Sequence, residues 1–476
     1  MLLIFSIAAI AISAWLLRQN TVSRRARPTK LNLPYVQFDG DNSASRYVAE
    51  TEAILSKGYA QYTSKGQPFS MRNPNDAPNP MVILPVKYLD EVRWLPEQRM
   101  SFWRHIDKQS ILTQIGGPGI NDEVTLAARS GMNRALVYLI EPLNEACVAA
   151  CTKEIPSCPE WASVLPYPLI IKIFAGMSAC AMVGPELGGL DSEWQSLSMR
   201  YVEAALSAPG VVKVSYPTWL YWMSQYTNKG VRTMWKLQTR ASELLAPVLQ
   251  ARVAATEELK AKGQRKVKGR RNTSGAGLSM LFDLMENPEV LPDIQEEIVR
   301  VRSANPTWTR RALGELRLLD SFMRESARIH ALTQYTAVQR IPTEQWTFKD
   351  ELTIPAGITL AFPSFHHNLD PAIHPDPGTF DPRRHLRKRE EIENTHRFHF
   401  ASASTDTMNW GSGRHACPGR FFAQETLKLM LVHLLTRYEF KHADDKTGVP
   451  RFISRNMFSI PNPTLPILMR ERKTAP

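Results

Sequence analysis

The feature that most constrains this chain is a glycine-rich stretch around one cysteine, directly before a long amphipathic helix. Residues 410–423 read WGSGRHACPGRFFA, with Cys417 near the middle. A cysteine at the beginning of a helix faces free N–H groups and the positive end of the helix dipole, which favour the thiolate. Gly411, Gly413 and Gly419 permit positive φ angles and let a flat ligand lie against the backbone. The stretch therefore predicts a thiolate site for a flat ligand.

Basic residues in the same stretch suit negative charge on such a ligand. Arg414 and His415 precede the cysteine by three and two positions, respectively. Two plainer interpretations stay open at this point. Cys417 can be a buried thiol in a loop that opens a helix, or a nucleophile paired with His415 or His433.

Two further patterns precede the cysteine. Glu325 and Arg328 lie three apart on a predicted helix and can pair on one face, although such pairs are usually solvated and weak. The segment Phe380–Arg384 (FDPRR) follows, and its last arginine lies 33 residues before Cys417. Either pattern alone indicates little, but the order of the two patterns before the cysteine stretch strengthens the case for a thiolate site.

The three patterns together resemble the cytochrome P450 family of haem-thiolate monooxygenases. The family's signature runs from an aromatic residue through glycine and a basic residue to the cysteine and a final glycine. Those places are held by Trp410, Gly413, His415, Cys417 and Gly419. Trp410 replaces the phenylalanine that is usual in the family, and His415 replaces the commoner arginine.

The resemblance implies roles for residues near the cofactor, haem b. Cys417 becomes the axial ligand of the haem iron, and His415, with Arg414, meets a propionate. Arg340, after the Glu325 helix, takes a second propionate contact, although a solvated arginine before a strand is an equally plain interpretation. His366, His367 and His374 fall in a family loop, so a separate metal site there is not expected.

The resemblance also implies structural roles. Glu325 and Arg328 form a buried pair behind the haem, tied to a loop arginine. Arg384 is the better match to that arginine, and Arg383 is the alternative. These residues hold the thiolate loop rather than take part in chemistry.

The implied fold is mainly α-helical with a small β portion, and the haem lies between a long central helix and the cysteine-loop helix. The implied function is oxidation of a lipophilic small molecule by O2, with electrons from NADPH through a membrane-bound reductase, since no flavin or dinucleotide fingerprint occurs here. The closest likeness is to fungal members, which suggests secondary metabolism and a terpenoid or indole-terpenoid substrate. The alternatives are a haem-thiolate isomerase, dehydratase or desaturase on the same fold, and an inactive haem-binding remnant.

The likeness is weakest between residues 240 and 284, where the central helix should cross the haem. Thr273 falls at the position of the family's oxygen-side threonine. The apolar turns that should precede it are replaced by a basic run, Lys260–Arg271, which cannot lie on an apolar pocket without a large desolvation cost. Three explanations stay open: a faulty gene model, a true variant with a shortened helix, and an inactive remnant.

The amino terminus predicts a membrane anchor. Residues 1–17 are apolar apart from two serines, which gives a helix of about 25 Å against a hydrocarbon core of about 30 Å. No basic residue precedes the run, which argues against a signal peptide. Basic residues fill the linker 18–34 and predict that the catalytic domain, residues 35–476, stays on the cytosolic side of the endoplasmic reticulum as a single-pass protein.

The net charge of +12 does not indicate nucleic-acid binding. The linker holds five basic residues and the run Lys260–Arg271 holds seven, and neither contains an acid, so the remainder is balanced. No zinc-finger, basic-zipper or aromatic–basic motif accompanies this charge. The sequon at Asn272 would stay unused on the cytosolic side.

Periodicity predicts several elements. A helix over Leu136–Cys151 is expected to be interrupted at Pro142, and its cysteines 147 and 151 are expected to be packed thiols rather than metal ligands. Asn287 is expected to cap a helix that begins at Pro288 and runs to Val301. A strand, turn and strand are expected over residues 346–362.

Overall fold

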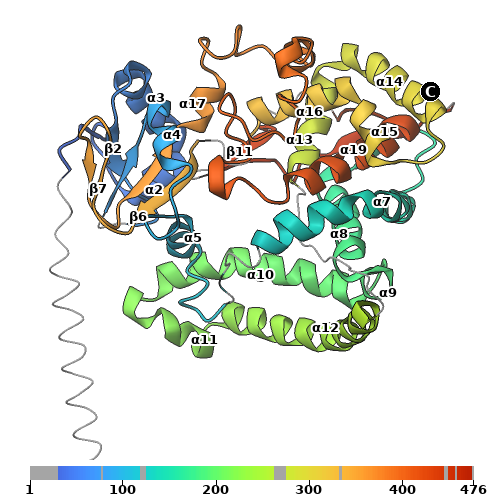
Figure 1. Cartoon of the computed structure of the whole chain (residues 1–476), viewed down its shortest axis with the longest axis horizontal. Coiled ribbons are helices and arrows are strands. Elements are labelled where there is room, and N and C mark those ends of the chain that lie inside the picture. The colour runs from blue at the N-terminus through green and yellow to red at the C-terminus, as the bar shows by residue number, and fades with distance from the viewer. Residues whose placement is uncertain are drawn as a thin grey trace, which may run out of the picture. The chain divides into compact units, whose positions relative to one another are not determined.

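The computed structural model describes residues 31–76, 79–117, 119, 125–261, 275–331, 335–443, 449–455 and 458–473 (Figure 1). The proposed anchor, most of the linker and Thr273 lie outside these residues. The chain forms two compact units. The first comprises Met1–Gly119, Ala205–Arg232 and Gln339–Phe362, and the second comprises Ile120–Ala204, Thr233–Val338 and Pro363–Pro476.

The first unit is built on a six-stranded sheet of order β1-β2-β3-β9-β6-β4. The strands are β1 (Tyr35–Val36), β2 (Phe69–Arg72), β3 (Pro80–Ile83), β9 (Thr359–Phe362), β6 (Ala337–Pro342, whose first two residues belong to the second unit) and β4 (Met100–Ser101). The hairpin β7 (Trp346–Thr347) and β8 (Thr353–Ile354) precedes β9. The helices of the first unit are α2 (Ala44–Ala49), α3 (Thr51–Gln61), α4 (Leu89–Val92), α5 (Phe102–Ser110) and α11 (Ser224–Thr227). The expected strand, turn and strand over 346–362 are present.

The second unit is mainly helical. Its helices are α7 (Asn133–Glu154, after a π-helical turn at Ala127–Met132), α8 (Pro166–Val183), α9 (Pro185–Gly188), α13 (Gly275–Glu286), α14 (Leu291–Ala304), α15 (Arg310–Glu315), α16 (Arg317–Ile329), α17 (Ser364–Asn368), α18 (Arg384–Lys388) and α19 (Arg420–Arg437). Two helices, α10 (Glu193–Ser215) and α12 (Lys229–Ala261), have residues in both units. The second unit also has two small sheets. One has the strand order β10 (Tyr438–His442), β13 (Ile467–Glu471), β5 (Ala162–Val164), and the other pairs β11 (Phe452–Arg455) with β12 (Phe458–Pro461).

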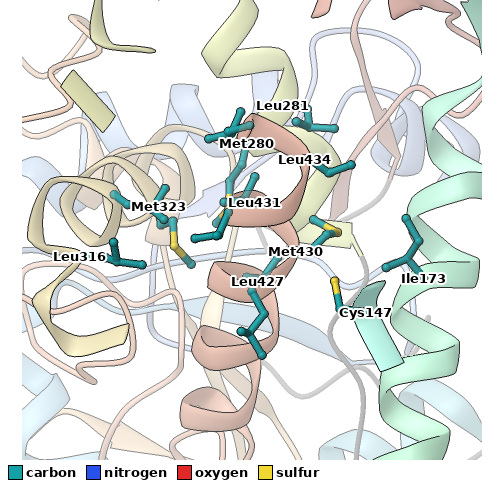
Figure 2. Packing of buried hydrophobic residues seen from close by; sticks show 14 of the residues in the cluster. Cys147, Ile173, Met280, Leu281, Leu316, Met323, Leu427, Met430, Leu431 and Leu434 are labelled. Atoms are coloured by element: carbon teal, nitrogen blue, oxygen red, sulfur yellow. The ribbon is translucent and has the colours of Figure 1, made fainter. Parts of the chain in front are cut away.

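The helix that follows the cysteine stretch, α19, runs through the core of the second unit. Figure 2 shows Leu427, Met430 and Leu431 on this helix, with Met323 of α16 on one side and Ile173 of α8 on the other. All of these side chains are buried. Because buried apolar side chains of this size each contribute about 1.5–3 kcal/mol, the packing fixes α19 in the unit.

Two local predictions were wrong. The helix α7 continues through Pro142, because the carbonyl that proline leaves without a donor belongs to Tyr138, a residue that is 82% exposed and so open to water. Asn287 does not cap α14: its side chain donates to the Asp283 carbonyl at the end of α13 (2.8 Å). Residues Pro288–Val290 form a 3₁₀ turn, and α14 begins at Leu291.

Among the described residues, two helices are long and apolar enough to cross a membrane by length and composition alone: the helical stretch Ala128–Glu154, which contains α7, and α8. Both contribute buried side chains to the core of the second unit.

Candidate functional site

The backbone of the cysteine stretch folds into a turn that closes on Trp410. The N–H of Cys417 donates to the Trp410 carbonyl (2.7 Å), and the Trp410 Nε1–H donates to the Phe400 carbonyl (2.6 Å). Gly411 and Gly413 have φ angles of 69° and 65°, a region that side-chain-bearing residues rarely adopt. The glycines are therefore needed for the turn that presents the half-buried cysteine.

Gly419 does not need a positive φ, contrary to the sequence-based expectation. Its φ is −90°, and it is the N-cap residue directly before α19. The reason is that the chain enters the helix directly after Pro418, so that a near-helical backbone suffices at Gly419. Its N–H points at the sulfur of Cys417 instead.

Opposing effects act on the Cys417 thiol. Burial raises its pKa, and the N–H groups of Gly419 and Arg420 together with the Arg420 charge oppose this rise. The Arg420 Nη1 also donates to the Cys417 carbonyl (2.9 Å). These donors stabilise negative charge on the sulfur, which is what a soft thiolate ligand to iron requires. The loop therefore fits a haem iron on the cysteine.

The two basic residues of the loop differ in exposure. Arg414 is exposed, and its carbonyl accepts from Arg129 Nη2 (2.5 Å). His415 is half-buried at the end of the short turn Gly413–His415. Both lie within three residues of Cys417, where a propionate contact can be made, and that role stays a prediction.

The Glu325 carboxylate lies at the centre of a buried cluster. Arg328 Nη2 is 2.7 Å from Glu325 Oε1, and Arg384 Nε is 3.0 Å from the same oxygen. The Asp381 N–H also donates to this oxygen (3.0 Å). Burial alone would raise the pKa of Glu325, but the bonds from Arg328 and His385 outweigh it and hold the pKa well below the usual range.

The arginine that meets Glu325 is Arg384, whereas Arg383 pairs with Asp293 at the surface. Arg384 also donates to the Pro375 carbonyl, which ties the segment before α18 to the cluster.

A residue that the sequence did not single out completes this cluster. His385 Nε2 lies 3.2 Å from Glu325 Oε2, and both side chains are fully buried. Burial lowers the pKa of His385 to about 4, so the ring is neutral near pH 7 and its Nε2 lies close to the carboxylate. Its only sequence signal is its position directly after Arg384.

A second buried cluster, also missed, joins the cysteine helix to α16. The carboxylate of Asp320 on α16 lies 2.9 Å from Lys428 Nζ on α19 and 3.0 Å from Arg389 Nη1. All three residues are at most 2% exposed. Burial would raise the pKa of Asp320, but the neighbouring cations, Lys428 first, hold it well below its usual range. The helix that follows Cys417 is thus held by charge as well as by apolar packing.

Arg340 belongs to the first unit. It is 2% exposed, its guanidinium lies 5.1 Å from the centre of the Phe102 ring, and its Nη1 donates to the carbonyl of Gln339. Its Nη2 has no partner among the described residues, and burial lowers the pKa to about 10. A buried guanidinium of this kind can bind an anion, and the propionate contact stays a prediction.

The central helix is short in the part that the structure describes. The helix α12 ends at Ala261, and α13 begins at Gly275 and has 12 residues. An added Cβ at Gly277 would lie 2.8 Å from the Met430 Cε, so α13 approaches α19 closely at this glycine. Thr273, the candidate oxygen-side hydroxyl, lies outside the described residues.

The remaining cysteine and histidine candidates have other contacts among the described residues. No group of three His, Cys, Asp or Glu side chains in the described residues is arranged to hold a metal ion. Cys147 and Cys151 are buried in the core of the second unit and contact each other. His367 and His374 instead contact backbone carbonyls.

Comparison with known proteins agrees with this geometry. A family model described as cytochrome P450 matches residues 267–469. The cytochrome P450 monooxygenase cheE of Chaetomium globosum is 32% identical over 98% of this chain and 97% of its own length. The pyrichalasin C-7 hydroxylase of Pyricularia grisea is 29% identical over 88% of each chain.

A crystal structure of the cytochrome P450DA heme domain shares the fold, with a TM-score of 0.63 over 93% of this chain and 98% of that chain at 14% identity. The mainly helical fold and these relatives define an oxidoreductase of the monooxygenase class. The chain belongs to the cytochrome P450 family, whose members use haem iron, O2 and an electron donor.

Proposed function

We propose that this protein oxidises a lipophilic small molecule of fungal secondary metabolism, of terpenoid type, by placing one oxygen atom from O2 on a carbon atom. The observation that carries the proposal is the cysteine loop, in which the Gly419 and Arg420 N–H groups are directed at the Cys417 sulfur. The name of one relative, a C-7 hydroxylase, supports hydroxylation of a C–H bond as the reaction class.

The residues of the loop have separate tasks in this proposal. Haem b, when bound through a thiolate, supplies the activation of O2. Cys417 holds the iron, and the N–H groups of Gly419 and Arg420 stabilise the charge on the sulfur. His415 and Arg414 bind a propionate, and Trp410 fixes the loop through its bonds to Cys417 and Phe400.

Five further residues complete the assignment. Arg340 binds a second propionate through its Nη2, which has no partner in the part of the chain that the structure describes. Glu325, Arg328 and Arg384 keep the loop in place and do not take part in the reaction. Thr273 is the sole hydroxyl that the family pattern offers for moving a proton to bound oxygen.

The basic run before Thr273 bears on whether the pocket is complete. A faulty gene model, which lost an exon or retained intron residues, explains this run best, because lysines and arginines there oppose an apolar pocket. Sequencing of the transcript across codons 240–290 tests this. A transcript that encodes the same run refutes the faulty gene model and leaves a variant helix or an inactive remnant.

The electron donor in this proposal is NADPH, through a membrane-bound reductase. Exposed Arg414, joined to exposed Arg129, and half-buried Arg420 give the face beside the cysteine a positive charge that suits an acidic partner. Reversal of one charge, Arg414→Glu, should raise the reductase concentration needed for half-maximal turnover and weaken the salt dependence. Unchanged kinetics at low salt would refute docking on this face.

We assign residues 1–17 as a single membrane span in the endoplasmic reticulum, residues 18–34 as the basic linker, and residues 35–476 as the cytosolic catalytic domain. The apolar composition of the first segment and the cations that follow it support this topology. Protease treatment of intact microsomes should digest the catalytic domain. Protection of that domain would refute the orientation.

The function is tested with the full chain and a fungal NADPH reductase in microsomes, supplied with terpenoid substrates and with pyrichalasin-type compounds. The proposal predicts substrate-dependent NADPH and O2 consumption and a product that contains one more oxygen atom. A rearranged, dehydrated or desaturated product without added oxygen supports the alternative reaction classes. Haem binding without any substrate-dependent consumption supports the inactive remnant.

A further inference from the structure

The segment Ser404–Trp410, which leads into the cysteine loop, has no helix or strand to satisfy its carbonyls. Two histidine rings satisfy two of them. His367 Nε2 lies 2.6 Å from the Thr405 oxygen, and His374 Nε2 lies 2.9 Å from the Asp406 oxygen. The rings are 4% and 0% exposed, so both donors are shielded from water.

The same region connects the segment to the Glu325 helix. Asn368, next to the first histidine, donates to the Arg328 carbonyl (3.0 Å) and to the Asn409 side-chain oxygen (3.1 Å). Asn409 directly precedes Trp410, whose carbonyl receives the Cys417 N–H. A displacement of the segment would therefore move the acceptor that closes the cysteine loop.

The partners define the form of both rings. A carbonyl oxygen can only accept, so each Nε2 must carry a hydrogen. In His374 the other ring nitrogen, Nδ1, is buried without a partner among the described residues, so a second proton would place a charge and an unsatisfied donor there. Burial lowers the pKa of His374 to about 4 and also lowers the pKa of His367. Both rings are therefore neutral donors near pH 7.

Some of the groups around the two rings favour protonation of the histidines, and others oppose it. The His385 ring lies 6.4 Å from that of His374. The charged groups that act on the two rings are Asp370 and Asp406, which favour protonation, and Lys388 and Arg328, which oppose it.

We propose that His367 and His374 are positioning residues for Cys417, and that their two Nε2–H donors fix the segment Ser404–Trp410 so that the cysteine loop keeps the thiolate on the haem iron. The inference rests on the proposed haem-thiolate site and adds to it two residues outside the cysteine loop. They act through the backbone and touch neither the cofactor nor the substrate in this role.

The test compares double variants of the holoenzyme in microsomes. Glutamine places an amide N–H near the position of Nε2 and does not titrate, whereas leucine has no donor. His367→Gln/His374→Gln is compared with His367→Leu/His374→Leu, and with His396→Leu as a control at an exposed histidine. The readout is the rate at which the reduced CO complex changes from the red-shifted thiolate form to the form without thiolate, with haem content and far-UV circular dichroism measured in parallel.

We expect this rate to rise about thirtyfold in the leucine variant, as for the loss of two net hydrogen bonds, and to stay within about threefold of wild type in the glutamine variant. Lowering the pH from about 7 to about 5 should accelerate the change in wild type more than in the glutamine variant. Each single leucine variant should show part of the effect if the double variant does not fold.

Equal rates in the leucine, glutamine and wild-type proteins would overturn the inference, as would equal acceleration in the glutamine and leucine variants. Both outcomes leave the proposed function intact, because the wild type still shows the thiolate form. Absence of that form in the wild type refutes the proposed function itself, and this inference with it.

Discussion

Replacing Glu325 with glutamine removes one charge from a buried cluster and leaves the shape of the side chain nearly unchanged. Oε1 accepts from Arg328, Arg384 and the Asp381 N–H, and Oε2 accepts from Arg328 Nε (2.9 Å). The amide oxygen can keep the bonds at one of these positions, and the amide N–H groups then face donors at the other. Two guanidinium groups also lose their counter-charge.

Removing one partner from a buried ion pair costs about 3–5 kcal/mol, and we expect Glu325→Gln to lower the free energy of unfolding by this amount. The assay is urea unfolding followed by far-UV circular dichroism. The matched control is Glu193→Gln, since Glu193 pairs with Arg240 at the surface with both side chains about half exposed. Solvent screens an exposed pair, so the control should leave the free energy of unfolding nearly unchanged.

The pH dependence gives a second check on the same variant. The pKa of Glu325 is lowered in the folded protein, so its carboxylate contributes stability above the unfolded pKa of about 4.3 and loses it as the pH falls toward the folded value. The stability difference between wild type and Glu325→Gln should therefore be full at pH 7 and shrink below about pH 4. A difference under about 1 kcal/mol at pH 7, or one that grows on acidification, would refute the reasoning.

Three further predictions concern the same unit. Lys428→Met leaves the α16 carboxylate without its nearest cation and should cost about 3–5 kcal/mol in urea unfolding, and a loss below about 1 kcal/mol would contradict the cluster. Cys417 and Cys180 are the half-buried thiols among five free cysteines, so haem loading should slow alkylation of Cys417 and leave Cys180 unchanged, as measured by mass spectrometry; equal slowing would contradict ligation. Gly411→Ala meets no atom within 3.4 Å but forces alanine to a φ of 69°, which should lower stability by about 1–2 kcal/mol, whereas Gly378→Ala, in open space, should change it by less than half as much.

The cysteine loop could be read from the sequence because its requirements are local. A thiol before a helix, with glycines where the backbone needs positive φ, leaves a pattern within ten residues, and Gly411 and Gly413 have that conformation. The pairing of Glu325 with Arg328 follows from their helical spacing in the same way. The role of Arg384 could be predicted only from the resemblance to the family.

The rest of the site depends on contacts between distant segments. Lysine usually lies at surfaces and histidine is intermediate, and nothing beside Lys428, His385 or His374 in the sequence shows that they are buried. Their partners are 32 to 108 residues away. Asn287 was misassigned for a related reason, because its side chain can bond either to the helix before it or to the helix after it. Sequence pattern does not choose between such partners, whereas packing does.

The most direct test of the haem-thiolate assignment is the reduced CO difference spectrum of the purified full-length chain. The account predicts the strongly red-shifted Soret band of thiolate ligation in wild type and in Cys147→Ala, whose thiol is buried away from the loop, and its loss in Cys417→Ala. A red-shifted band that persists in Cys417→Ala, or wild-type protein that binds no haem, would contradict it.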